Sequence, residues 1–142
     1  MDKKELFNQF ISFMSSVHHV SNELTKDAKH HSISQVQYNI LEFIKVNQPV
    51  TPTEINDCLK MTMSNTSREL SKLSEKNMIE KAPDTNDRRK QSIKLSEDGE
   101  VLMNEAFHII EVRFLDRIKD ASNEDLKEIE QAFDVLREKL FK

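Results

Sequence analysis

The stretch from Thr62 to Gly99 constrains the fold more than any other part of the chain, because it sets one short helix and two short strands in a fixed order. Thr62 can cap the N-terminus of a helix. Three residues then recur on one helical face: Thr66, Leu70 and Leu73. Asn77 follows, where a helix often ends in a left-handed turn that Asn tolerates. We therefore expect a short amphipathic helix over about residues 62–76.

Two strand-like runs follow this helix, Met78–Ala82 and Ser92–Leu95, and a polar turn separates them. The turn carries four consecutive charged residues, Asp87-Arg88-Arg89-Lys90. A helix followed by a hairpin with a charged tip is typical of a winged helix-turn-helix. We expect the wing to cover about residues 78–96.

The composition narrows the fold class. Only 1 Gly and 3 Pro occur among 142 residues, which leaves little room for the turns of an all-β fold. The length suits one compact domain, so the expected class is mainly α with a small β wing. No apolar run approaches the roughly 20 residues that span a bilayer, and the start MDKKELF lacks the features of a secretory signal. With a single Cys, these features favour a cytoplasmic location and no membrane partner.

Charge is distributed unevenly along the chain. The net charge is −4, yet residues 60–94 hold nine Lys or Arg against five Asp or Glu. A locally basic module can present a positive face to phosphates even within an acidic protein. For any single Lys, a solvated surface role remains the simpler alternative.

Helices are expected on both sides of this module. Caps and apolar periodicity place them at about Lys3–Lys29, Gln35–Val46, Thr51 or Thr53 to Lys60, Ser96–Ala121, and after Ser122. Val50-Thr51 could add a very short strand. The third of these helices should turn three residues inward: Ile55, Cys58 and Leu59. The first carries a wide apolar stripe, which predicts a partner helix or, alternatively, burial in the chain's own core.

The wing sequence resembles the signature of the MarR (multiple antibiotic resistance regulator) family of winged helix-turn-helix transcription regulators. That signature is Asp-x-Arg, five residues, Leu-Thr, and Gly three residues on. Four residues match it, with Ser96 in place of the Thr: Asp87, Arg89, Leu95 and Gly99. The order of the flanking helices also fits. The resemblance implies one domain over residues 1–142, with dimerisation helices at 3–31 and 97–142 and the winged helix-turn-helix at 34–96.

A recognition helix places its N-terminal residues against base edges in the major groove. The expected DNA-binding residues of this helix are Ser64, Asn65, Ser67, Arg68 and Lys72. Asn65 can pair with adenine, and Arg68 with guanine, through two hydrogen bonds each. Lys72 and Lys76 are better placed for phosphates. Glu69 is awkward at a DNA surface. It could point at a cytosine amine, neutralise Arg68 or face away, and we expect it to neutralise Arg68.

The expected DNA-binding residues of the wing are Asp87, Arg88, Arg89 and Lys90. The resemblance assigns Arg89 to the minor groove and Asp87 to orienting it. A guanidinium on a thin hairpin can enter the narrow, negative minor groove of A·T-rich DNA, and a carboxylate on the same strand face can hold it. Arg88 and Lys90 would reach phosphates from the other face. The alternative is a charged hairpin that only keeps a sheet edge soluble.

These features predict a sequence-specific DNA-binding transcription regulator that is not an enzyme and needs no cofactor. We expect a homodimeric repressor on a pseudo-palindromic operator of double-stranded DNA. The resemblance implies release by a small effector, often aromatic or phenolic. One alternative is a winged-helix protein-interaction module without DNA binding, which the acidic net charge favours.

The His and Cys residues leave two sensing roles open. A zinc-sensing regulator would draw on His30 or His31 together with Glu105 or His108, although the spacing that would confirm a metal site is missing. An oxidant-sensing regulator would use Cys58, which its apolar neighbours predict to be a buried small hydrophobe instead.

Overall fold

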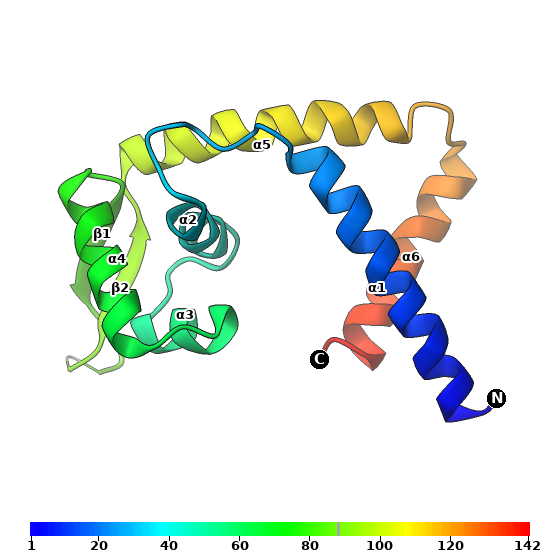
Figure 1. Ribbon diagram of the computed structural model, residues 1–142, viewed down its shortest axis with the longest axis horizontal. Helices are drawn as coiled ribbons and strands as arrows, with labels where there is room; N and C mark the ends of the chain where they lie inside the picture. The colour runs from blue at the N-terminus through cyan, green and yellow to red at the C-terminus, as the bar shows by residue number, and fades with distance from the viewer. Residues whose placement is uncertain (88) are drawn as a thin grey trace. The chain divides into compact units, whose positions relative to one another are not determined.

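The computed structural model describes residues 1–87 and 89–142, and in them six helices and two strands follow the predicted order (Figure 1). The helices are α1 (Lys3–Thr25), α2 (Gln35–Asn47), α3 (Pro52–Leu59), α4 (Met63–Glu75), α5 (Glu97–Arg117) and α6 (Asn123–Lys139). The strands are β1 (Ile79–Pro83) and β2 (Gln91–Leu95). The predicted class, mainly α with a small β wing, is confirmed. In the described residues, no helix has the length and apolar character to cross a membrane.

Hydroxyl side chains begin the helices where the sequence predicts them. Ser34 and Ser122 each form a capping box with the third residue of α2 and α6. Thr51 and Thr62 accept hydrogen bonds from backbone N–H groups in the first turns of α3 and α4. Local hydrogen bonds therefore account for most of the predicted starts.

Two helices end four residues earlier than predicted. α1 stops at Thr25 because Asp27 adopts a left-handed conformation, with φ 58°, that no helix can continue through. α5 stops at Arg117, since the N–H of Lys119 bonds the carbonyl of Asp116 three residues back and tightens the last turn.

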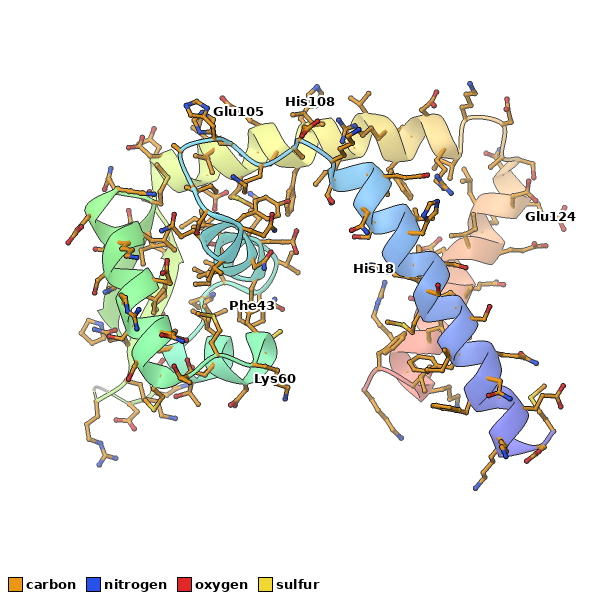
Figure 2. The ribbon with its side chains drawn as sticks, in the orientation of Figure 1. His18, Phe43, Lys60, Glu105, His108 and Glu124 are labelled. Carbon is orange, nitrogen blue, oxygen red and sulfur yellow. The ribbon has the colours of Figure 1, made fainter. Side chains whose placement is uncertain are left out.

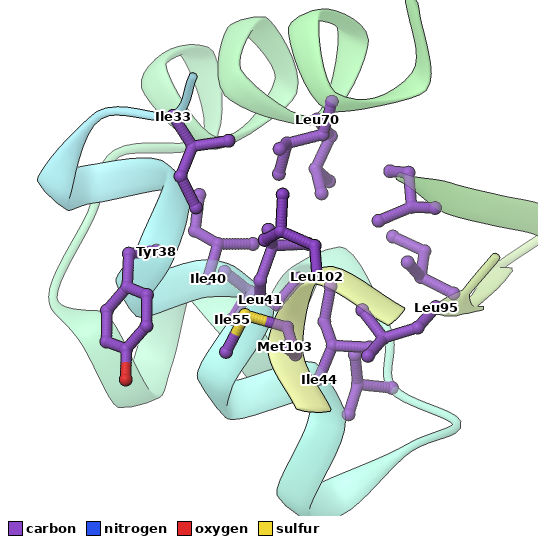
Figure 3. Packing of buried hydrophobic residues seen from close by; sticks show 14 of the residues in the cluster. Ile33, Tyr38, Ile40, Leu41, Ile44, Ile55, Leu70, Leu95, Leu102 and Met103 are labelled. Atoms are coloured by element: carbon purple, nitrogen blue, oxygen red, sulfur yellow. The ribbon is translucent and has the colours of Figure 1, made fainter. Parts of the chain in front are cut away.

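The chain divides into two compact units, residues 1–110 and 111–142. The first unit contains a hydrophobic cluster to which α2, α3, α4, both strands and the start of α5 contribute (Figure 3). Its largest fully buried apolar side chains are Ile40, Leu41, Ile44, Ile55, Leu70, Leu73, Ile93 and Met103. Each such side chain stabilises the fold by about 1.5–3 kcal/mol relative to an exposed one. The second unit consists of the end of α5 and α6, and α6 has no buried residue.

The two strands pair antiparallel, with Ile79 opposite Leu95 and Pro83 opposite Gln91. Val50 adds the predicted short third partner through two hydrogen bonds with Ile93, of 2.9 and 2.7 Å. Only the inner residues of the sheet are buried, and its tip extends into solvent. The middle of β2 is therefore anchored to the segment between α2 and α3.

Four residues, which we call the wing-base junction, join the end of α4, the wing and the start of α5: Asn77, Met78, Ser96 and Gly99. Asn77 takes the predicted left-handed turn, with φ 59°. The Ser96 N–H donates to the Met78 carbonyl at 3.0 Å. The Ser96 hydroxyl donates to the Asn77 carbonyl at 2.5 Å and accepts from the Gly99 N–H at 3.0 Å. A Cβ on Gly99 would lie 2.1 Å from the Met78 oxygen. The junction therefore requires a residue without a Cβ.

We expect Gly99→Ala to lower the free energy of unfolding by about 2 kcal/mol, because the added methyl overpacks a backbone carbonyl that is already hydrogen-bonded. Helix propensity alone predicts the opposite sign, a gain of roughly 0.5–1 kcal/mol. Urea denaturation of the two proteins measures the difference. Asn104→Ala, at an exposed position of the same helix, is the control. A Gly99→Ala variant as stable as the parent would contradict this account of the junction.

Candidate nucleic-acid interface

The N-terminal half of α4 presents a polar surface to solvent. All five residues predicted to bind DNA from this helix are exposed: Ser64, Asn65, Ser67, Arg68 and Lys72. The opposite face, with Thr66 and Leu70, is buried in the hydrophobic cluster. Helical periodicity thus fixes which side of α4 can meet a ligand.

Two of these residues hold each other in place. The guanidinium of Arg68 donates from Nη2 to Oδ1 of Asn65 at 2.7 Å. The N–H of Asn65 in turn bonds the Thr62 side chain that caps the helix, at 3.1 Å. Arg68 keeps its other donors, and Asn65 keeps its amide N–H groups. Both side chains therefore retain hydrogen-bonding groups suited to base edges.

The predicted pairing of Glu69 with Arg68 is wrong. Successive residues on a helix point about 100° apart and do not face each other. Glu69 instead points toward α2, where its Oε2 accepts a hydrogen bond from Nε2 of Gln37 at 3.1 Å. Its Oε1 lies 3.4 Å from Nζ of Lys72.

Lys76, at the end of α4, also differs from the expectation. Its Nζ donates to the carbonyl of Ser32 at 2.8 Å and to Oε1 of Gln37 at 2.9 Å. This ammonium therefore holds the segment between α1 and α2 rather than projecting from the DNA-facing surface.

The turn between α3 and α4 has the expected position, at Lys60-Met61-Thr62. Lys60 lies in this turn, after the end of α3 (Figure 2). It adopts a left-handed conformation, with φ 54° and ψ 45°, in a turn of the kind that often contains Gly. The prediction that Cys58 faces inward is wrong, because Cys58 is exposed. α3 has only eight residues, and the position turned fully into the core belongs to Ile55.

At the wing tip, Asp87 and Arg89 are in contact as predicted, but in the turn between the strands rather than on a strand face. Oδ1 of Asp87 accepts from the backbone N–H of Arg89 at 3.0 Å and from Nε of Arg89 at 3.3 Å. These two bonds, the backbone one first, hold the pKa of Asp87 below its usual value. The Arg89 side chain is 91% exposed, so the anchored guanidinium projects into solvent.

The other two predicted wing residues can be placed only in part. Lys90 is exposed, and its N–H donates to the Asp87 carbonyl at 3.0 Å, which closes the turn. Arg88 lies outside the described residues.

A pocket of about 300 Å³ lies between the α1–α2 segment and α5. It is lined by Asp27, Ala28, Lys29, His30, His31, Leu102, Glu105, Ala106 and Ile109. Nδ1 of His30 accepts a hydrogen bond from the N–H of Ser32 at 3.1 Å. The neutral His30 ring must therefore carry its proton on Nε2. The His30 and His31 rings stack with their centroids 4.2 Å apart.

The zinc alternative would need some of these side chains to converge. Glu105 and His108 both lie on α5 (Figure 2). Within residues 1–87 and 89–142, no group of three or more His, Cys, Asp or Glu side chains could hold a metal ion.

Gln37 is a buried residue behind this surface that sequence reasoning missed. Its place three residues after Ser34 marks it as part of a capping box, which the structure shows. Its bonds to Glu69 and Lys76 join residues more than thirty positions apart, and no local pattern signals them.

We expect Arg89→Ala to raise the pKa of Asp87 part of the way to the usual value for Asp. The variant removes the guanidinium but keeps the backbone N–H, which is the larger cause of the shift. Carbon-detected NMR titration of the Asp carboxyls measures it. Lys94→Ala, which alters a wing lysine paired with Glu80, should leave the Asp87 titration in place. An ordinary pKa for Asp87 in the parent protein would contradict the contact.

Comparison with known proteins agrees with this geometry. The MarR family model matches residues 31–90. The uncharacterized HTH-type transcriptional regulator YdgG of Bacillus subtilis is 28% identical over 138 residues, which cover 95% of this chain and 90% of that protein.

Two solved structures share the fold. The transcriptional regulator Tm0710 of Thermotoga maritima superimposes with a TM-score of 0.71 at 18% identity, over 92% of this chain and 98% of that chain. FabT of Streptococcus pneumoniae, in complex with DNA, superimposes with a TM-score of 0.62 at 18% identity, over 96% of each chain. The family model match over residues 31–90 agrees with the resemblance identified from the wing sequence.

Proposed function

We propose that this chain, a transcription regulator of the MarR family, binds specific sites on double-stranded DNA as a homodimer and represses transcription there. The observation that carries the proposal is the pair of projecting polar surfaces on one compact unit. One is the N-terminal half of α4, and the other is Arg89 held by Asp87 at the wing tip. The DNA complex of the FabT fold relative supports this reading. A role on DNA fits the cytoplasmic location that we expect.

The two surfaces suit different grooves. The α4 residues would meet base edges in the major groove, where Asn65 and Arg68 discriminate adenine and guanine. Arg89 would enter an adjacent minor groove, which attracts a guanidinium most strongly in A·T-rich DNA. Lys72 and Lys90 would contact phosphates. With two copies, the α4 helices would occupy successive major grooves about 34 Å apart on a pseudo-palindromic site.

Exposed apolar side chains support the homodimer. α1 has no buried residue, and Leu6 and Phe7 are 53% and 58% exposed. In the second unit, Leu115 and Phe133 are about half exposed as well. Apolar surface of this extent marks a protein contact. A second copy of the chain, paired through residues 3–31 and 97–142, would cover it.

The pocket beside His30 is our candidate effector site. Its volume is at the lower limit of small-ligand sites, which suits a small aromatic or phenolic compound. The Lys29 ammonium bonds the carbonyls of His30 and Ile33, at 3.3 and 2.6 Å, and could attract an anion. The same segment continues to Ser32, whose carbonyl binds Lys76 at the end of α4. A bound ligand that moved this segment would move the recognition helix.

We expect Arg89→Ala to weaken specific binding about tenfold or more with the fold intact, because a minor-groove contact and its charge are lost. Fluorescence anisotropy would compare a duplex from the chain's own promoter with a scrambled duplex over a salt series. Lys127→Ala, which removes an exposed positive charge from α6, should bind as the parent does. Equal binding by the parent and Arg89→Ala would favour the protein-interaction module instead.

We also expect Phe7→Glu to dissociate the dimer, because a carboxylate would be buried in an apolar contact without a partner. One chain has a mass of 16.6 kDa. At micromolar concentration, sedimentation equilibrium should give twice this mass for the parent and the mass of a single chain for the variant. Lys3→Glu, at an exposed polar position of α1, is the control. A parent that sediments as a monomer would rule out the homodimer.

A further inference from the structure

We propose that Gln37 is a positioning residue for DNA binding, which holds the Glu69 carboxylate against α2 and keeps its charge away from the DNA-facing surface of α4. The inference rests on the proposed function. It adds a role to a residue that lies on α2, outside the predicted DNA-binding set.

Gln37 is buried, with 5% of its surface exposed, and both ends of its amide are used. Oε1 accepts from the Ser34 N–H at 3.1 Å and from Nζ of Lys76 at 2.9 Å. Nε2 donates to Oε2 of Glu69 at 3.1 Å. The amide thus joins the start of α2 to two positions on α4.

Glu69 would interfere with DNA if it were released. It lies one helical turn after Asn65 and three residues before Lys72, the residues expected to read a base and to bind a phosphate. In the structure its side chain is only 17% exposed. A carboxylate that rotated outward at this position would repel nearby phosphates.

Glutamine is the residue type that this position requires. The Ser34 N–H and the Lys76 ammonium both need an acceptor, and Glu69 needs a donor. An amide supplies both groups at once. A glutamate at the same position would satisfy the first two partners, but it would place a second carboxylate against Glu69.

This chemistry allows the amide and the carboxylate to be exchanged. Gln37→Glu keeps the capping box and the Lys76 contact but repels Glu69. We expect it to weaken binding to a duplex from the chain's own promoter about tenfold at low salt. Adding Glu69→Gln puts the amide on α4 and the carboxylate on α2, so the hydrogen bond returns with its direction reversed. The double variant should bind within about twofold of the parent.

Two comparisons separate this role from a general loss of structure. The defect of Gln37→Glu should shrink as salt is raised, because screening weakens the repulsion. Glu75→Gln, which removes an exposed negative charge from α4, should not rescue Gln37→Glu. Thermal denaturation of each variant ensures that binding is read on folded protein.

The outcomes are distinct. If Gln37→Glu binds as tightly as the parent, or if the double variant is as weak as Gln37→Glu, the inference is wrong while the proposed function stands. If the parent binds the promoter duplex no better than a scrambled one, the proposed function fails and the inference fails with it.

Discussion

The close approach of Gly99 to the carbonyl of Met78 is the constraint on which the DNA-binding unit depends. At this point α4 ends, the wing begins and closes, and α5 starts. The Ser96 hydroxyl caps α5 and at the same time donates to the Asn77 carbonyl, and Gly99 permits the close approach of the helix to Met78. At this junction, backbone atoms and the short Ser96 side chain therefore help to set the position of the wing relative to the recognition helix. That is the property that two surfaces need in order to reach adjacent grooves together.

Two glutamines complete this frame from the ends of α2. Gln37 bonds Glu69 on α4 and Lys76, the residue that follows the end of that helix. Gln48 accepts from the Leu95 N–H in β2 at 2.9 Å and donates to Glu100 in α5 at 2.8 Å. Lys45 and Gln48 together lower the pKa of Glu100. The stability that this carboxylate contributes is thus present above its ordinary pKa and is lost as the pH falls through the lowered value. α2 therefore fixes the recognition helix at one end and the wing at the other.

The sequence predicted the features that local chemistry decides. Caps such as Ser34, the spacing of Leu70 and Leu73, and the left-handed turn at Asn77 all depend on neighbours within a few residues. Two predictions that depended on distant partners were wrong. Cys58 had apolar neighbours along the chain but is exposed on α3, and Glu69 found its partner on another helix. The exposure of the predicted α4 residues followed from periodicity, whereas their contacts with DNA stay predictions.

The segment between α1 and α2 would link recognition to regulation if the pocket beside His30 binds the effector that we propose. Its His30 lines the pocket against α5, and the N–H of Ser32 fixes that ring. The carbonyl of the same Ser32 binds Lys76, whose ammonium also contacts Gln37. A displacement of this peptide would reach α4 through two hydrogen bonds and would disturb the residue that restrains Glu69. Loss of DNA affinity would then need no movement of the hydrophobic core, because the polar contacts at the end of α4 are the ones that change.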